Sequence, residues 1–299
     1  MTSAPIPKLT RLSVEVGLTE HCNIKCHACA HASPLLPEKF TGLDGFVRDI
    51  EALSAAFHAS ELRLVGGEPL LHPDLPAFIA EGRRVGIADR VIVYTNGVLL
   101  HQMPAAFWQS IDGLRISAYP GIRRRLDDEA CARLCRDNGV ELTIKPFPTF
   151  EQTLLGRRID DRPLVKAIYR ACNTARICHT IHDGRFYKCP MAALMRPWLA
   201  LHGIPYESPP GDGVALHGNP GLRHDLEAYL DDPAPLAACD YCLGSSGAAV
   251  RHRQLDRTGC AAWLAEDAQP LIDDVRTRLL GRGLRAAVRR VRSMIAERA

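Results

Sequence analysis

Short runs of aliphatic and β-branched residues alternate with segments of helical spacing along the first half of the chain. The apolar runs lie at Leu12–Leu18, Glu61–Val65, Arg90–Tyr94, Leu114–Ala118 and Glu141–Lys145. Each run is bounded by Gly, Pro or Asn, which is typical of strands. Between the first two, apolar residues recur every three or four positions, as an amphipathic helix requires, at Phe46, Ile50, Leu53 and Phe57. The repeated strand–helix order predicts an α/β fold, a partial (β/α)6 TIM-like barrel with its chemistry at the carboxyl ends of the strands.

The pattern changes after about residue 165. The segment Ile181–Cys189 is typical of a β-hairpin with its turn at Asp183–Gly184. Residues 203–221 are rich in Pro, Gly and His, which favours an irregular loop. We therefore divide the chain into a partial barrel core (1–165), an auxiliary module that includes the last barrel elements (166–262) and a basic amphipathic C-terminal helix (263–299).

Composition and charge narrow the classes of protein that fit. Apolar residues make up 46% of the 299 positions, which excludes collagen-like and wholly disordered chains. The chain has no apolar run of about 18 residues, as a membrane-spanning helix needs, and no export signal, so we expect a cytoplasmic protein. Residues 271–299 carry eight arginines and three acidic residues on an otherwise mildly acidic chain of net charge +3. We expect neither a nucleic-acid nor a membrane partner, and we interpret the basic tail as the solvated face of a helix. The alternative is that the tail contacts nucleic acid, a membrane surface or another subunit.

Eleven cysteines are unusual for a reducing compartment, where metal ligation or redox chemistry is the better explanation than disulfides. Three of them, Cys22, Cys26 and Cys29, follow the first predicted strand in the segment CNIKCHAC. Three thiolates on one loop can bind three irons of a cubane cluster and leave the fourth iron open. A structural zinc ion takes four protein ligands, which His27 or His31 would complete here.

The cysteine spacing CxxxCxxC, followed by GGEPL at the end of the second strand, resembles the radical S-adenosylmethionine (SAM) superfamily over residues 12–150. The resemblance implies that Cys22, Cys26 and Cys29 hold a 4Fe–4S cluster whose open iron chelates SAM. One electron then cleaves SAM to methionine and a 5′-deoxyadenosyl radical, which abstracts a substrate hydrogen. The resemblance also implies SAM-binding roles at the strand ends for Gly66, Gly67, Glu68, Thr95, Asn96 and Ser117. The residue before the third cysteine, usually aromatic in this superfamily, is Ala28 here.

A second group of cysteines has the pattern C-x11-G-x4-C followed by C-x2-C, formed by Cys172, Gly184, Cys189, Cys239 and Cys242. This pattern resembles the shortened auxiliary-cluster module, called twitch, of some radical SAM enzymes. The glycine permits a hairpin turn that returns the second cysteine toward the first. The resemblance implies that the four thiolates hold a second 4Fe–4S cluster; a zinc ion is the alternative occupant. Cys178 is the alternative to Cys172 as a ligand.

One further thiol, Cys260, lies beyond this module in the segment DRTGC. In radical SAM epimerases a cysteine thiol donates a hydrogen atom to the substrate radical, and the resemblance implies that Cys260 has this role, with Cys178 in reserve. The implied function is epimerisation of an aminoglycoside, a cationic carbohydrate, with electrons from a flavodoxin- or ferredoxin-type reductant. The alternative is a dehydrogenase that oxidises an aminocyclitol or aminoglycoside alcohol through the auxiliary cluster. A peptide-modifying radical SAM enzyme is more remote.

Overall fold

The computed structural model describes residues 7–281 and contains one eight-stranded sheet of order β5-β4-β3-β2-β1-β7-β8-β9. Six neighbouring strands are parallel: β1 (Leu9–Gly17), β2 (Phe57–Val65), β3 (Ala88–Thr95), β4 (Gly113–Ala118), β5 (Glu141–Pro146) and β7 (Thr180–His182). This confirms the α/β fold class with a partial, TIM-like barrel. Each strand run predicted in the first half overlaps one of these strands.

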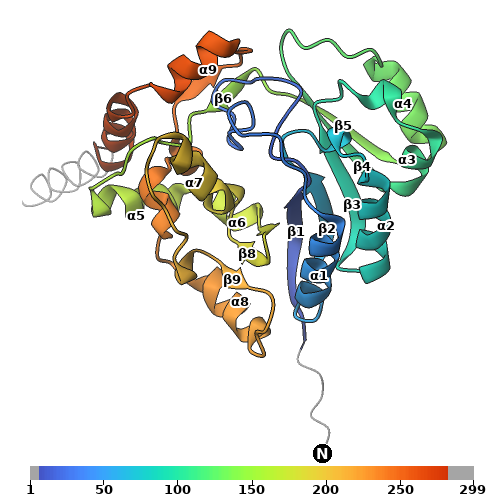
Figure 1. Ribbon diagram of the computed structural model, residues 1–299, viewed down its shortest axis with the longest axis horizontal. Helices are drawn as coiled ribbons and strands as arrows, with labels where there is room; N and C mark the ends of the chain where they lie inside the picture. Colours follow the sequence, from blue (N-terminus) through green and yellow to red (C-terminus); the bar gives the residue numbers. More distant parts are fainter. Residues whose placement is uncertain (1–6, 282–299) are drawn as a thin grey trace, which may run out of the picture.

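Four helices follow the first four strands and cover one face of the sheet, as Figure 1 shows: α1 (Leu43–Ser54), α2 (Leu75–Val85), α3 (Ala105–Ser110) and α4 (Asp128–Asp137). In α1 three residues of the predicted apolar stripe, Phe46, Ile50 and Leu53, are buried. The fourth, Phe57, lies beyond the end of the helix and begins β2, so its inclusion in the helix was wrong. The three helical residues pack into the main core with strand residues such as Leu62 and Leu64. Burial of this stripe stabilises the pairing of helix and sheet, at about 1.5–3 kcal/mol for each large side chain.

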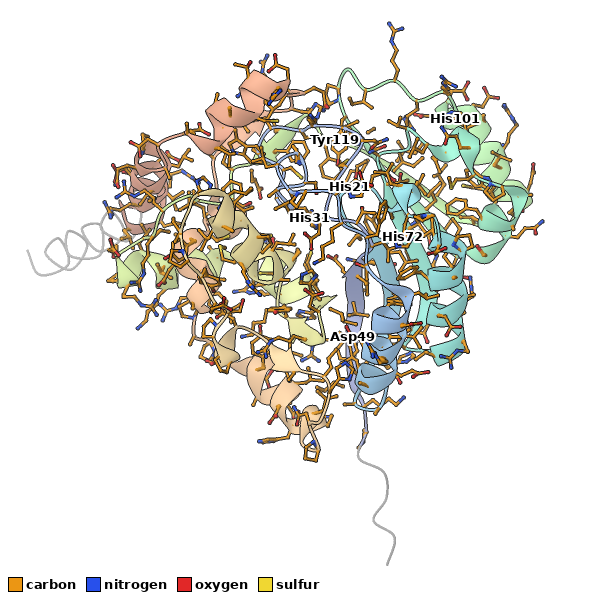
Figure 2. All side chains as sticks on the ribbon, in the orientation of Figure 1. His21, His31, Asp49, His72, His101 and Tyr119 are labelled. Atoms are coloured by element: carbon orange, nitrogen blue, oxygen red, sulfur yellow. The ribbon has the colours of Figure 1, made fainter. Side chains whose placement is uncertain are left out.

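The predicted hairpin is present: β7 pairs antiparallel with β8 (Arg185–Tyr187), and β9 (Val214–Ala215) extends the sheet. Its turn residues Asp183 and Gly184 have φ of 44° and 74°. Positive φ at both central residues is what a two-residue type I′ hairpin turn requires. The carboxylate of Asp49 on α1, labelled in Figure 2, accepts a hydrogen bond from the Gly184 amide (3.0 Å) and contacts the His217 ring (2.6 Å). The hairpin is thus part of the core sheet and is fixed to its first helix.

The other helices of the second half are α5 (Arg162–Ala171), α6 (Thr174–Ile177), α7 (Pro190–Leu201), α8 (Leu222–Asp231), α9 (Arg257–Leu264) and a helical stretch at 269–281. Short 3₁₀ turns occur at η1 (Pro69–Leu71), η2 (Leu100–Gln102), η3 (Pro210–Asp212), η4 (Ala237–Tyr241) and η5 (Gly244–Ser246). Within 7–281, no helix is long and apolar enough to cross a membrane. The rest of the predicted basic C-terminal helix, 282–299, lies outside the described residues.

Three short strands were not predicted. One is β9, which lies within the segment 203–221 that was expected to be an irregular loop and becomes a strand by pairing with β8. The others are β6 (Thr149–Glu151) and β10 (Ala249–Arg251), which form a separate antiparallel pair. Three residues are too few for a period-two pattern to be visible in a sequence. Beyond β10 the chain crosses the predicted cluster loop, where the His27 amide donates to the Arg253 carbonyl (3.0 Å). The pair therefore brings the C-terminal part of the chain onto the first cysteine group.

Candidate functional site

A cavity of about 680 Å³ opens at the carboxyl ends of the parallel strands. Its volume is in the range of small-molecule and cofactor sites. Every predicted cluster cysteine and SAM-binding residue of the first half lines it: Cys22, Cys26, Cys29, Gly66, Gly67, Glu68, Thr95, Asn96 and Ser117. His31 and Tyr119, which also line it, lie above the strands in Figure 2. The structure thus brings together residues that the sequence separates by almost one hundred positions.

The glycine pair positions the cysteine loop. Gly66 has a φ of +136°, and a Cβ there would collide with the backbone of Thr19. A Cβ on Gly67 would collide with the His21 carbonyl and approach the Cys22 amide. The Gly67 amide donates to the Thr19 carbonyl at 2.8 Å. The loop that carries the first cysteine can therefore lie directly on the end of β2 only because both residues lack a side chain.

Gly67→Ala is expected to prevent iron loading of the first cysteine group, because the new methyl group would displace the backbone that leads into Cys22. The measurement is iron and sulfide per chain after anaerobic reconstitution. The matched control is Gly45→Ala, since Gly45 lies on α1 with open space around its Cα. Iron content equal to wild type in Gly67→Ala would contradict this account of the loop.

Glu68 joins the ends of two strands. Its carboxylate is fully buried and accepts hydrogen bonds from the Thr95 hydroxyl (2.6 Å), the Asn96 amide (2.8 Å) and the Leu70 amide (3.1 Å). Burial raises the pKa of Glu68 to about 7, and the three donors oppose that rise. Both carboxylate oxygens are therefore used by the protein itself. Glu68 holds the rim of the cavity in shape, in addition to facing the space predicted for SAM.

The thiols of the first cysteine group are largely withdrawn from water. Burial raises the pKa of both Cys22 and Cys26 to about 12, and it also raises the pKa of Cys29. Such thiols become ligands when a metal replaces their protons. Among residues 7–281, no three His, Cys, Asp or Glu side chains are arranged around one metal-ion position. A cubane cluster differs from a single ion, because the three thiolates would bind three different irons.

Two buried polar atoms at this cavity lack a hydrogen-bond partner within the protein, His31 Nε2 and Thr153 Oγ1. Buried polar atoms in proteins are nearly always paired. The Asn96 amide group points at the same region: it donates to Asn23 Oδ1 (2.7 Å), and its nitrogen lies 3.6 Å from Cys22 Sγ. The residues present therefore fit a cavity that holds a polar cofactor beside the cysteines.

The second cysteine group also comes together. Cys172, Cys189, Cys239 and Cys242 line one small cavity between α5, α7 and η4. Burial raises the pKa of Cys189 to about 12, and it also raises the pKa values of Cys239 and Cys242. Cys178 is not among the lining residues and lies in the large cavity instead. Of the two candidates for this group, it is Cys172 that lies with the other three thiols.

A buried cation lies beside this group. The Lys188 side chain is 1% exposed, and its ammonium donates to the Tyr169 hydroxyl and the Asp232 carbonyl, both at 2.8 Å. It also lies over the rings of Tyr169 and Tyr229, 5.4 and 5.1 Å from their centroids. Burial of a charge is costly unless an opposite charge compensates it. An anionic cluster on four thiolates next to Lys188 would supply that charge, so the residues present fit such a group.

No protein-family model matches the chain. Curated relatives include the GTP 3′,8-cyclase of Chlorobaculum tepidum, 33% identical over 106 residues, which are 35% of this chain and 32% of that protein. The GTP 3′,8-cyclase of Helicobacter pylori is 34% identical over 95 residues, 30% of this chain and 29% of that protein. The chain spans about a third of the length of these relatives, which are themselves radical SAM enzymes.

Among solved structures, BtrN in complex with AdoMet (SAM) and 2-DOIA aligns with 81% of this chain and 96% of its own, at 16% identity and a TM-score of 0.50. That alignment shows a shared fold. Over the residues that they match, the curated relatives support the resemblance of the chain to the radical SAM superfamily. The cysteine loop follows β1 and the Gly66–Gly67 segment follows β2, where that resemblance implied them.

The large cavity is lined by one further thiol, and it is not Cys260. Cys260 lies on α9, where it packs at the edge of a core cluster with Trp263, and it does not line the cavity. Cys178, at the end of α6, lines the cavity together with Glu15. Of the two predicted hydrogen donors, Cys178 thus lines the cavity and Cys260 does not.

Sequence reasoning missed the polar residues inside the barrel. Glu15 on β1 and Tyr94 on β3 line the cavity, and the guanidinium of Arg63 on β2 lies 3.5 Å from the Glu15 carboxylate and over the Tyr94 ring. Burial raises the pKa of Glu15, and Arg63 opposes that rise. The sequence contained a signal for Glu15, because it is a charged residue between Val14 and Val16 in a strand that is buried on both faces.

Proposed function

We propose that this protein epimerises a small hydroxylated substrate: it removes a hydrogen atom from one carbon with a SAM-derived radical, and Cys178 returns one from the other face. The observation that carries the proposal is the shared cavity, which holds the loop of Cys22, Cys26 and Cys29 at its rim and the Cys178 thiol beside the body of β1. A substrate between them can meet both. The substrate class we propose is an aminoglycoside or a related cationic carbohydrate.

In this proposal Cys22, Cys26 and Cys29 hold a 4Fe–4S cluster, and the strand-end residues Gly66, Gly67, Glu68, Thr95, Asn96 and Ser117 surround SAM. When bound, the cluster supplies the electron that cleaves SAM to methionine and a 5′-deoxyadenosyl radical. The unpaired atoms of His31 and Thr153 are available to the polar groups of SAM or substrate. Asn96 orients the cluster loop through its contacts with Asn23 and Cys22.

Cys178 has the properties of a hydrogen donor. Burial raises the pKa of its thiol to about 12, so that the S–H bond is retained at neutral pH. When the substrate carbon radical takes this hydrogen atom, a C–H bond forms, the S–H bond breaks and Cys178 becomes a thiyl radical. One electron from a flavodoxin- or ferredoxin-type reductant and one proton restore the thiol. The Glu15 carboxyl lines the same cavity, and its pKa is raised by burial, so it is placed to hold that proton.

A dehydrogenase is the second candidate, and the four thiols around one small cavity favour it. With Cys172, Cys189, Cys239 and Cys242 as ligands, a second 4Fe–4S cluster supplies an acceptor for one electron. The substrate radical would then lose that electron, and its hydroxyl proton would leave to a base, so that an alcohol becomes a ketone. The shared fold with BtrN, crystallised with AdoMet and 2-DOIA, supports this alternative as well.

Anaerobic turnover in D2O separates the two reactions. The reconstituted protein is incubated with SAM, a one-electron reductant and a panel of aminoglycosides and aminocyclitols, and products are read by mass spectrometry. We expect a product one dalton heavier that carries deuterium on carbon, because the Cys178 thiol exchanges with solvent. A product two daltons lighter would establish the dehydrogenase instead. If no 5′-deoxyadenosine forms with any substrate of the panel, the proposed substrate class is wrong.

A further inference from the structure

The segment after β10 lies against the cysteine loop as a short antiparallel clamp. The Leu255 amide donates to the Lys25 carbonyl at 2.7 Å, and the His27 amide donates to the Arg253 carbonyl at 3.0 Å. Between these two bonds, Cys26 and Gln254 face each other as a bridged pair. The clamp therefore holds residue 254 opposite one cysteine of the first group, although 228 positions separate the two in the sequence.

The orientation of the Gln254 amide is determined by its neighbours. Its Oε1 accepts a hydrogen bond from the Lys25 backbone amide at 2.8 Å, which only the oxygen of a side-chain amide can do. Its Nε2 must then point the other way, where Cys26 Sγ lies at 3.2 Å. The same nitrogen lies 3.0 Å from Nε2 of His252, which itself lies 3.2 Å from Cys26 Sγ. One hydrogen of the Gln254 amide is thus directed at Cys26.

The His252 ring, which lies beside the Gln254 amide, is held in place by two aromatic side chains. The ring of His252 stacks on Tyr119, with centroids 5.1 Å apart and planes at 15°. Phe150 of β6 packs against both rings, at 5.5 Å from each centroid. Cys26 is 5% exposed, so its side of the contact is largely withdrawn from water. A hydrogen bond in such surroundings is stronger than one in water.

We propose that Gln254 is a positioning residue that donates a hydrogen bond to the Cys26 thiolate and raises the reduction potential of the iron–sulfur cluster held there. The inference rests on the proposed cluster ligands. Reduction adds negative charge to the cluster, and a donor at a ligand sulfur stabilises that charge. Loss of the donor makes the reduced cluster less stable and the potential more negative.

The test is a potentiometric titration of the reconstituted full-length protein, followed by electron paramagnetic resonance without SAM. We compare wild type with Gln254→Leu, which removes the donor, and Gln254→Glu, which directs a carboxylate at the sulfur. Gln254 is an exposed residue, so neither change disturbs the core. The matched control is Gln102→Leu, because Gln102 is exposed on η2 and does not line the cavity.

The expected order of midpoint potentials is wild type highest, Gln254→Leu lower and Gln254→Glu lowest, with Gln102→Leu equal to wild type. A paramagnetic resonance signal from a cluster on the four-cysteine group should have the same midpoint potential in all four proteins, and it serves as an internal reference. Equal potentials in all four proteins would overturn the proposal. Loss of iron from both Gln254 variants would also overturn it, because the amide would then hold the loop and not tune the cluster. Failure of the proposed function is a separate result: wild type would carry the cluster and yet form no 5′-deoxyadenosine.

Discussion

Cys22→Ala is expected to abolish SAM cleavage and to leave about half of the iron, since only one of two 4Fe–4S clusters loses a ligand. Cys22 lies at the end of the loop that Gly67 positions, and its sulfur is the one that Asn96 approaches. With a ligand missing, the iron that would receive SAM is no longer held at the rim of the cavity. Cys239→Ala is the matched change in the second group, and it should also remove about half of the iron while 5′-deoxyadenosine still forms.

Iron and sulfide assays, together with chromatography of 5′-deoxyadenosine, measure both effects. Cys135→Ala is the control, because Cys135 is buried in α4 as a core residue and belongs to neither group. Undiminished 5′-deoxyadenosine from Cys22→Ala would remove this residue from the ligand set. Iron near the wild-type level in Cys239→Ala would show that the four-cysteine group holds no second cluster.

The barrel strands were predictable because each is an apolar run that ends in residues of turn-forming type. The first run was expected at Leu12–Leu18, whereas β1 covers Leu9–Gly17. Its early residues Thr10 and Arg11 are polar, and they are strand residues only because they pair with β2. The strands β6 and β10 are held by pairing across a hundred residues, which no local pattern records.

The candidate site likewise has residues that the sequence predicts and contacts that it does not. Motif residues such as Cys22, Gly66 and Thr95 follow consecutive parallel strands, so the topology brings them to one rim without further information. The choice between Cys178 and Cys260 depends on which helix end faces the cavity, and spacing in the sequence carries no such information. Gln254 was not found at all, since its contact with Cys26 exists only when the chain returns from β10.

Cys178→Ala is expected to keep SAM cleavage and hydrogen abstraction but to lose the inverted product, because the substrate radical then has no thiol in the cavity. In D2O, product with deuterium on carbon should fall to background while 5′-deoxyadenosine still forms. The matched variant is Cys260→Ala, which should invert the substrate as wild type does, since Cys260 lies on α9 away from the cavity lining.

The pH dependence of inversion gives an independent measurement on the same thiol. An exposed thiol has a pKa of about 8.5 and loses its S–H bond as the pH rises through that value. Burial raises the pKa of Cys178 to about 12, so its S–H bond persists and inversion should not decline between pH 7 and pH 9. A decline near pH 8.5 would indicate an exposed donor. The opposite result is that Cys260→Ala loses inversion and Cys178→Ala keeps it. In that case α9 would have to move to the cavity during turnover, and the donor would be Cys260.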